Sequence, residues 1–91
     1  MQTRAEIVVN GLVQGVGFRY YVFREAISLG VMGYTRNLYS GEVQTVVEGE
    51  KAMVEELIKK IKVGPSHAAV KNCWIDWQEP KNEFDDFKIS G

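Results

Sequence analysis

Cysteine and histidine are scarce in this sequence, and their scarcity excludes several kinds of site. Among 91 residues there is one cysteine, Cys73, and one histidine, His67. A single cysteine forms neither an internal disulfide nor a cysteine-based metal cluster, and it favours the reducing cytoplasm as the compartment. His67 follows Gly64-Pro65-Ser66, where an exposed loop residue is expected. No histidine-based catalytic or metal site is therefore predicted.

The sequence also lacks a long apolar run and an excess of charge of either sign. Residues 1–6 have no signal-peptide character, and no apolar stretch approaches the length of a membrane span. Eleven basic and twelve acidic residues give a formal net charge of −1, with the basic residues scattered along the chain. This balance disfavours long polyanions as partners. We expect a cytoplasmic protein that binds neither membranes nor nucleic acid, although a small anion held at one point remains compatible.

The composition is that of a compact globular domain. Apolar residues make up 45% of the chain and charged residues 25%. A chain of this length has room for one hydrophobic core and not for two. Residues 1–91 are therefore predicted to form a single domain, which we expect to be a monomer.

Two segments have the apolar periodicity of amphipathic helices, and the others read as strands. Phe18–Leu29 and Glu50–Lys62 carry apolar residues at helical spacing. Ser40-Gly41 separates two extended segments and predicts a tight hairpin turn. The predicted strands are Ile7–Val13, Val31–Tyr39, Glu42–Glu48, Val70–Gln78 and a short terminal strand within Phe84–Ile89.

The predicted order of elements is strand, helix, strand, strand, helix, strand, with a possible fifth strand. It indicates an α+β, ferredoxin-like βαββαβ fold in which two helices cover one face of an antiparallel sheet. In the third strand Val43, Thr45 and Val47 share one face, which leaves Glu48 on a face expected to meet water. The acidic segment 79–86 is predicted to be a solvated loop.

The run Gln14-Gly15-Val16-Gly17-Phe18-Arg19 lies between the first predicted strand and the first predicted helix. Glycines permit unusual backbone angles and let a ligand approach the main chain, while the start of a helix offers free N–H groups and partial positive charge. An arginine in the first helical turn can grip two oxygens of one phosphate in its planar fork. The segment therefore predicts a cradle for a phosphoryl group.

Other interpretations of this glycine-rich segment are weaker or remain open. Tyr20 stands where a dinucleotide-binding motif has its third glycine, and no Gly-Lys-Ser/Thr follows as in a Walker A loop. Nucleotide binding is therefore disfavoured. The short pattern is also compatible with a simple connector whose arginine is only solvated.

The longer string Gly11–Arg19 resembles the signature of acylphosphatases, and a second acylphosphatase signature is matched by Gly30–Asn37 followed by Ser40–Val43. The resemblance extends over essentially the whole chain. Tyr34 and Thr35 differ from the residues that many relatives carry, but neither position holds a reactive group.

This resemblance implies hydrolysis of acyl phosphates, in which a carboxylate is joined to phosphate as a mixed anhydride. It assigns phosphoryl binding to Arg19 and to the main-chain N–H groups of residues 14–18, and it assigns positioning of the attacking water to Asn37. The carboxylate is a good leaving group, so alignment and charge stabilisation supply most of the catalysis. No metal, cofactor or covalent intermediate is expected, and inorganic phosphate is the expected product and inhibitor.

Two competing functions follow from the same sequence. Trp74 and the tyrosines could lie on the uncovered sheet face and stack with RNA bases, but the basic-aromatic motif of such modules is missing. Acylphosphatase-like domains also occur inside larger hydrogenase-maturation enzymes, which suggests a non-catalytic anion-binding module. Because both Arg19 and Asn37 are present, stand-alone hydrolysis is preferred.

Overall fold

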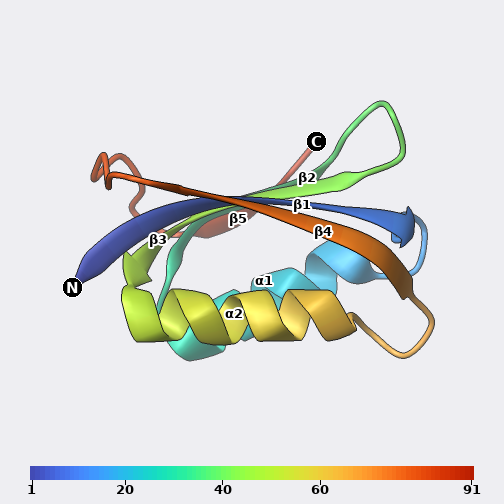
Figure 1. The fold of residues 1–91 in the computed structure, drawn as a ribbon, viewed down its shortest axis with the longest axis horizontal. Helices are drawn as coiled ribbons and strands as arrows, with labels where there is room; N and C mark the ends of the chain where they lie inside the picture. Colours follow the sequence, from blue (N-terminus) through green and yellow to red (C-terminus); the bar gives the residue numbers. More distant parts are fainter.

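The computed structural model describes residues 1–91 as one five-stranded sheet with two helices packed on one face (Figure 1). The predicted order of elements is confirmed, with boundaries shifted by a few residues. The elements are β1 (Gln2–Leu12), α1 (Phe18–Leu29), β2 (Met32–Asn37), β3 (Val43–Glu50), α2 (Lys51–Val63), β4 (Ala69–Gln78) and β5 (Phe87–Ser90). Neither helix is long and apolar enough to cross a bilayer.

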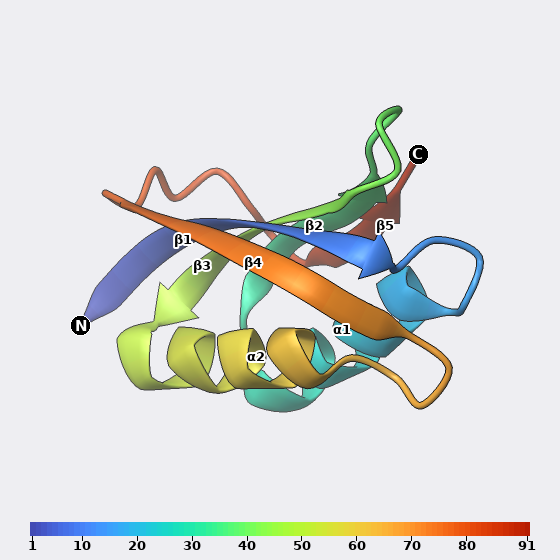
Figure 2. The same ribbon diagram turned by 45° about the vertical axis from the view of Figure 1, so that its right-hand side comes forward.

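The four strands of the predicted βαββαβ order pair antiparallel as expected, and the parallel pairing of the fifth strand makes the whole sheet mixed. Its strand order is β4-β1-β3-β2-β5, and the pairs β4–β1, β1–β3 and β3–β2 are antiparallel, whereas β5 pairs parallel with β2. After β4 the chain reverses direction and crosses to the far edge of the sheet (Figure 2). A strand that runs opposite to β4 at that edge runs in the same direction as β2, so the pairing is parallel.

The core lies between the sheet and the two helices. Alternate residues of the central strands point down toward the helices, and the apolar stripe of each helix points up toward the sheet, as the two periodicities require. Burial of this apolar surface is the main stabilising term of such a domain. The fifteen residues of the core cluster are Ala5, Ile7, Val9, Val13, Phe18, Val22, Ala26, Val31, Val43, Val47, Val54, Leu57, Ile58, Ile61 and Phe87.

The first strand begins at Gln2, five residues before the predicted start at Ile7. The sequence did not indicate a strand at this point because Arg4 is charged, and a charged residue is not expected to be buried. In the structure Arg4 is only 7% exposed, on the face of the sheet opposite the helices. Its Nη1 donates to carboxylate oxygens of Glu48 and Glu83, each at 2.7 Å, and its guanidinium lies 5.2 Å from the centre of the Phe84 ring. These partners make burial of the cation tolerable.

Glu48 does not face water as predicted, because the segment 79–86 folds over it. Only 4% of the residue is exposed. The main-chain N–H groups of Lys81 and Asn82 donate to its two carboxylate oxygens at 2.8 and 3.0 Å, in addition to the bond from Arg4. We call Arg4, Glu48 and residues 81–84 the Glu48 cluster. It fixes the path of a segment predicted to be a solvated loop, and that path leads directly into β5.

Candidate active site

The loop between β1 and α1 lies at the same end of the sheet as the β2–β3 hairpin, as both ribbon views show (Figures 1 and 2). Within this loop Gly15 and Gly17 have positive φ angles of 75° and 76°, in the left-handed region that favours glycine. Apart from the adjacent residues of the chain, a Cβ atom at either position would meet no atom within 4 Å. The loop therefore presents its backbone to open space, which leaves room for a ligand.

The beginning of α1 favours an anion. Gly17 caps the helix without a side-chain hydrogen bond, and no acidic residue stands in the first turn. The first N–H groups of a helix have no partner within the helix, and they carry the positive end of its dipole. Anions commonly bind at such a terminus. This part of the predicted cradle has the required electrostatic sign.

A cavity of about 180 Å³ opens over the loop and the first turn of α1. Arg19 is the only charged residue in its lining, so no carboxylate opposes an anion there. Asn37, the last residue of β2, reaches the same cavity although it lies eighteen positions beyond Arg19 in the chain. The lining residues are Val13, Gly15, Gly17, Phe18, Arg19, Tyr20, Asn37 and Ile89.

Arg19 is oriented by the end of β5. Its Nη1 donates to the main-chain oxygens of Ser90 and Gly91 at 3.3 and 3.4 Å, which are long bonds. A guanidinium has five N–H donors, so these two contacts leave several for a ligand. The contacts that orient the guanidinium at the cavity thus leave N–H groups free to bind a ligand.

The sequence matches the acylphosphatase family model over residues 5–89. This chain belongs to the acylphosphatase family. It is 44% identical over 89 residues to the acylphosphatase of Caldanaerobacter subterraneus subsp. tengcongensis, an alignment that covers 98% of this chain and 99% of the relative. It is 43% identical over 90 residues to the acylphosphatase of Thermococcus kodakarensis, with 99% and 98% covered.

Solved structures agree with this acylphosphatase assignment. The crystal structure of acylphosphatase from Bacillus subtilis superposes with a TM-score of 0.94 at 28% identity, and each chain is covered completely. The structure of full-length HypF in its phosphate- and nucleotide-bound form gives a TM-score of 0.91 at 37% identity, but this chain spans only 12% of that protein. The expected fold class is confirmed by these matches.

Two residues of the signature shared with acylphosphatases, Gln14 and Val16, do not line the cavity. The Gln14 side chain instead donates from Nε2 to the main-chain oxygens of Leu38 and Glu42, both at 2.9 Å. Both acceptors belong to the hairpin that begins immediately after Asn37. The Gln14 side chain therefore ties the loop to the strand end that carries Asn37, a positioning role that the sequence alone did not suggest.

Three lining residues were not among the site residues predicted from the acylphosphatase resemblance: Val13, Tyr20 and Ile89. Val13 is buried and belongs to the core cluster, whereas Tyr20 is 58% exposed and Ile89 is 42% exposed. The position of Tyr20 next to Arg19 in the first helical turn was an available signal. No local sequence pattern indicated that Ile89 lies at the cavity, because only the crossing of residues 79–86 brings β5 to this end of the sheet.

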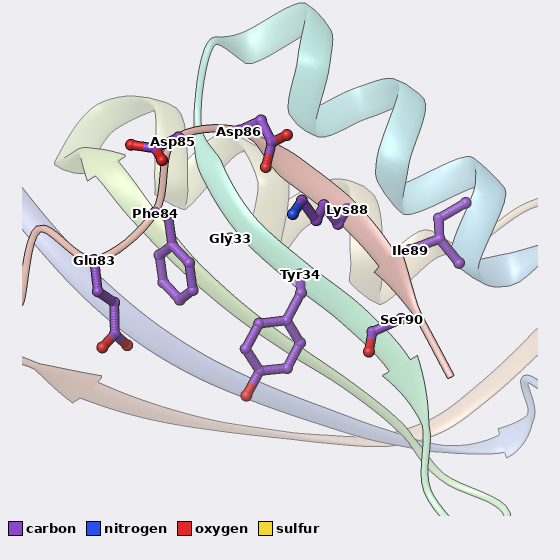
Figure 3. A pocket seen from close by; sticks show the side chains of 9 residues that line it. All are labelled: Gly33, Tyr34, Glu83, Phe84, Asp85, Asp86, Lys88, Ile89 and Ser90. Carbon is purple, nitrogen blue, oxygen red and sulfur yellow. The ribbon is translucent and has the colours of Figure 1, made fainter.

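A second hollow, of about 430 Å³, lies between β2, β5 and the segment before β5 (Figure 3). In this view Tyr34 and Phe84 point to the same side, and their rings are 5.9 Å apart. The lining includes Lys88 and three carboxylates, so the local potential opposes a phosphoryl group. The carboxylates of the chain do not gather with other ligands into a group of three or more that could hold a metal ion. This second hollow is therefore not a candidate for the acylphosphatase active site.

Proposed function

We propose that this protein hydrolyses acyl phosphates to a carboxylate and inorganic phosphate, and that the reaction takes place in the cavity above the β1–α1 loop. The observation that carries the proposal is the meeting of two separate parts of the chain in one cavity: the segment that contains the glycine loop and Arg19, and the end of β2 that carries Asn37. Membership of the acylphosphatase family and the names of the relatives support the same activity.

Phosphoryl binding is assigned to Arg19 and to main-chain N–H groups between Gln14 and Phe18. The loop glycines leave the backbone accessible, and the helix start supplies unpaired donors. These donors stabilise the charge that spreads over the equatorial oxygens during transfer. Since they belong to a folded loop and helix, they need little reorganisation when the substrate arrives.

Asn37 is assigned to positioning the attacking water in line with the leaving carboxylate. A carboxamide both donates and accepts hydrogen bonds, so it can fix the orientation of water, and it brings no negative charge to repel phosphate. The carboxylate leaving group requires little protonation, and an oxygen of the substrate phosphate can accept the proton of the water. This mechanism requires no general base, which fits the exposed position of His67 in the turn after α2.

We further propose that residues 1–91 act as one domain, as a monomer, in the cytoplasm. A single core cluster and a single free cysteine support the first and last of these statements. Inorganic phosphate is proposed to be both product and competitive inhibitor, because it presents the same oxygens to the same donors.

The proposal is tested by assaying benzoyl phosphate hydrolysis with and without a chelator, and by replacing Arg19 with Ala. We expect turnover that the chelator does not change. In Arg19→Ala the inhibition constant for phosphate should rise about ten- to hundredfold, because a charged hydrogen-bond donor is lost. Arg24→Ala, which removes a similar charge one turn further along α1, should leave the inhibition constant unchanged.

The outcomes separate hydrolysis from its alternatives. Phosphate binding without turnover would identify a non-catalytic anion-binding module, like a domain taken from a larger enzyme. An Arg19→Ala variant that binds phosphate as tightly as the parent would show that the anion is held elsewhere.

A further inference from the structure

We propose that Tyr20 and Ile89 form the subsite for the acyl group of the substrate, and that this subsite favours aromatic acyl groups over acetyl. The inference rests on the proposed function, since it takes the same cavity as the place where the phosphoryl group binds. It adds a specificity-determining surface to a site whose phosphoryl-binding parts do not distinguish one acyl group from another.

The lining of the cavity leaves few side chains that could meet an acyl group. Gly15 and Gly17 have no side chain, and Arg19 and Asn37 are assigned to phosphate and water. Val13 and Phe18 are buried, with 1% and 2% exposure, and belong to the core. Only Tyr20 and Ile89 remain, and both are partly exposed and offer an apolar surface, the ring of Tyr20 and the aliphatic side chain of Ile89.

Tyr20 presents a ring that its neighbours hold in place. The ring is stacked against Phe23, with centroids 6.3 Å apart and planes inclined by 22°. The guanidinium carbon of Arg24 lies 5.9 Å from the Tyr20 ring centre. Contacts of these two kinds restrict the motion of the ring. The exposed face of Tyr20 is therefore an ordered surface and not a freely rotating side chain.

Tyr20 also stands between the phosphate cavity and a neighbouring hollow of about 320 Å³. Tyr20 and Gly17 line both spaces, and the second one continues along α1 past Arg24 to Pro65. A substrate group larger than phosphate that leaves the cavity on this side must pass along Tyr20. The protein thus has room for an acyl group where the ring can contact it.

Ile89 supplies a second apolar wall from β5. Figure 3 shows Ile89 pointing away from Tyr34, on the side of β5 that faces α1, and it reaches the phosphate cavity there. The same strand contacts α1 through Phe87, whose ring lies 6.4 Å from that of Phe23. Phe87 is buried in the core, so this packing fixes β5 against α1 and holds Ile89 beside the cavity.

The chemistry of Tyr20 and Ile89 indicates which acyl groups gain the most favourable binding contacts. A flat aromatic ring can stack on Tyr20 and remove apolar area of both partners from water. An acetyl group ends in one methyl and covers little of this surface. Because the contact is made equally before and during phosphoryl transfer, it should lower KM for aromatic substrates and leave kcat nearly unchanged.

The test compares benzoyl phosphate with acetyl phosphate in Tyr20→Ala and Ile89→Ala. In each variant the ratio of kcat/KM for benzoyl to that for acetyl phosphate should fall, by about three- to tenfold for Tyr20→Ala, through a higher KM for benzoyl phosphate. Tyr20→Phe should keep the ratio of the parent. Ile27→Ala, which truncates an apolar residue of α1 that is 54% exposed and outside the cavity, should also keep it.

An unchanged ratio in both Tyr20→Ala and Ile89→Ala would overturn the subsite. So would an equal loss for both substrates that appears in kcat, because that pattern indicates damage to the fold or to the phosphoryl site. Neither result bears on the phosphate-binding role of Arg19, which is measured separately by phosphate inhibition. Failure of the subsite is thus distinguishable from failure of the proposed function.

Discussion

Asn37→Ala is expected to lower kcat for benzoyl phosphate by about a hundred- to a thousandfold, or about 2.7–4 kcal/mol of transition-state stabilisation, the usual effect of removing one positioned donor. The inhibition constant for phosphate should stay close to that of the parent, because Arg19 and the loop amides are retained. The split arises because the amide acts on the attacking water and not on the bound anion. Steady-state kinetics with phosphate as competitive inhibitor measure both quantities.

Two further variants sharpen the experiment on Asn37. Asn37→Asp keeps the size of the side chain but adds a negative charge beside the phosphoryl group, so it should raise the inhibition constant for phosphate as well as lower kcat. Asn72→Ala removes an exposed amide on β4, outside the cavity, and should change neither quantity. An Asn37→Ala variant with the turnover of the parent would contradict the assigned role.

Glu48→Ala should lower the free energy of unfolding by about 3–5 kcal/mol, the usual result of breaking a buried ion pair on one side. The change leaves the Arg4 guanidinium, which is 8% exposed, with the half-exposed carboxylate of Glu83 as its only ion-pair partner. It also removes the acceptor of the Lys81 and Asn82 N–H groups, which hold the segment leading to β5. Urea denaturation of parent and variant at pH 7 measures the loss.

The exposed ion pair between Lys59 and Glu56 provides the matched control. Its side chains are 72% and 46% exposed, so Glu56→Ala should cost at most about 1 kcal/mol. Replacing both buried partners, Arg4→Met with Glu48→Leu, should cost less than Glu48→Ala alone, because no buried charge is then left, and the Glu83 carboxylate that loses Arg4 is half-exposed. A Glu48→Ala variant as stable as the control would show that the Glu48 cluster contributes little.

The contribution of Glu48 should also depend on pH. Burial alone raises the pKa of its carboxyl, but hydrogen bonds from the Lys81 N–H, from Arg4 and from the Asn82 N–H outweigh that effect, and the net pKa is lowered from its ordinary value of 4.5. A group with a lowered folded-state pKa stabilises the protein fully above its unfolded-state pKa and loses that effect as pH falls through the folded-state pKa. The difference in unfolding free energy between parent and Glu48→Ala should therefore be constant from about pH 7 to 5 and shrink below about pH 4.5.

Most of the fold could be predicted from local patterns in the sequence. The apolar stripes of Phe18–Leu29 and of Glu50–Lys62 were sufficient to locate both helices, because helical periodicity is a property of neighbouring residues. The start of β1 and the environment of Glu48 were predicted wrongly for the opposite reason. Arg4 and Glu48 are charged, and their burial depends on distant partners: those of Arg4 lie 44 to 79 positions away along the chain, and those of Glu48 lie 33 to 44 positions away. No local pattern contains that information.

The glycine loop was likewise readable from its own residues, since positive φ and open backbone are intrinsic to the Gly15–Gly17 segment. Asn37 lines the same cavity as this loop, because the β2–β3 hairpin returns to the loop and Gln14 bonds to the main-chain oxygens of Leu38 and Glu42 in that hairpin. The roles of Arg19 and Asn37 remain predictions for the kinetic experiments to decide.

The amino-acid sequence by itself determined the two helices, the succession of strands, the glycine loop and the family, because each of these depends on residue types at short and regular spacing. Tertiary structure alone decided the parallel pairing of β5, the burial of the Glu48 cluster and the arrival of Ile89 at the cavity. These features depend on where the 79–86 segment crosses the sheet. That path is set by contacts between residues far apart in the chain, which a one-dimensional pattern does not encode.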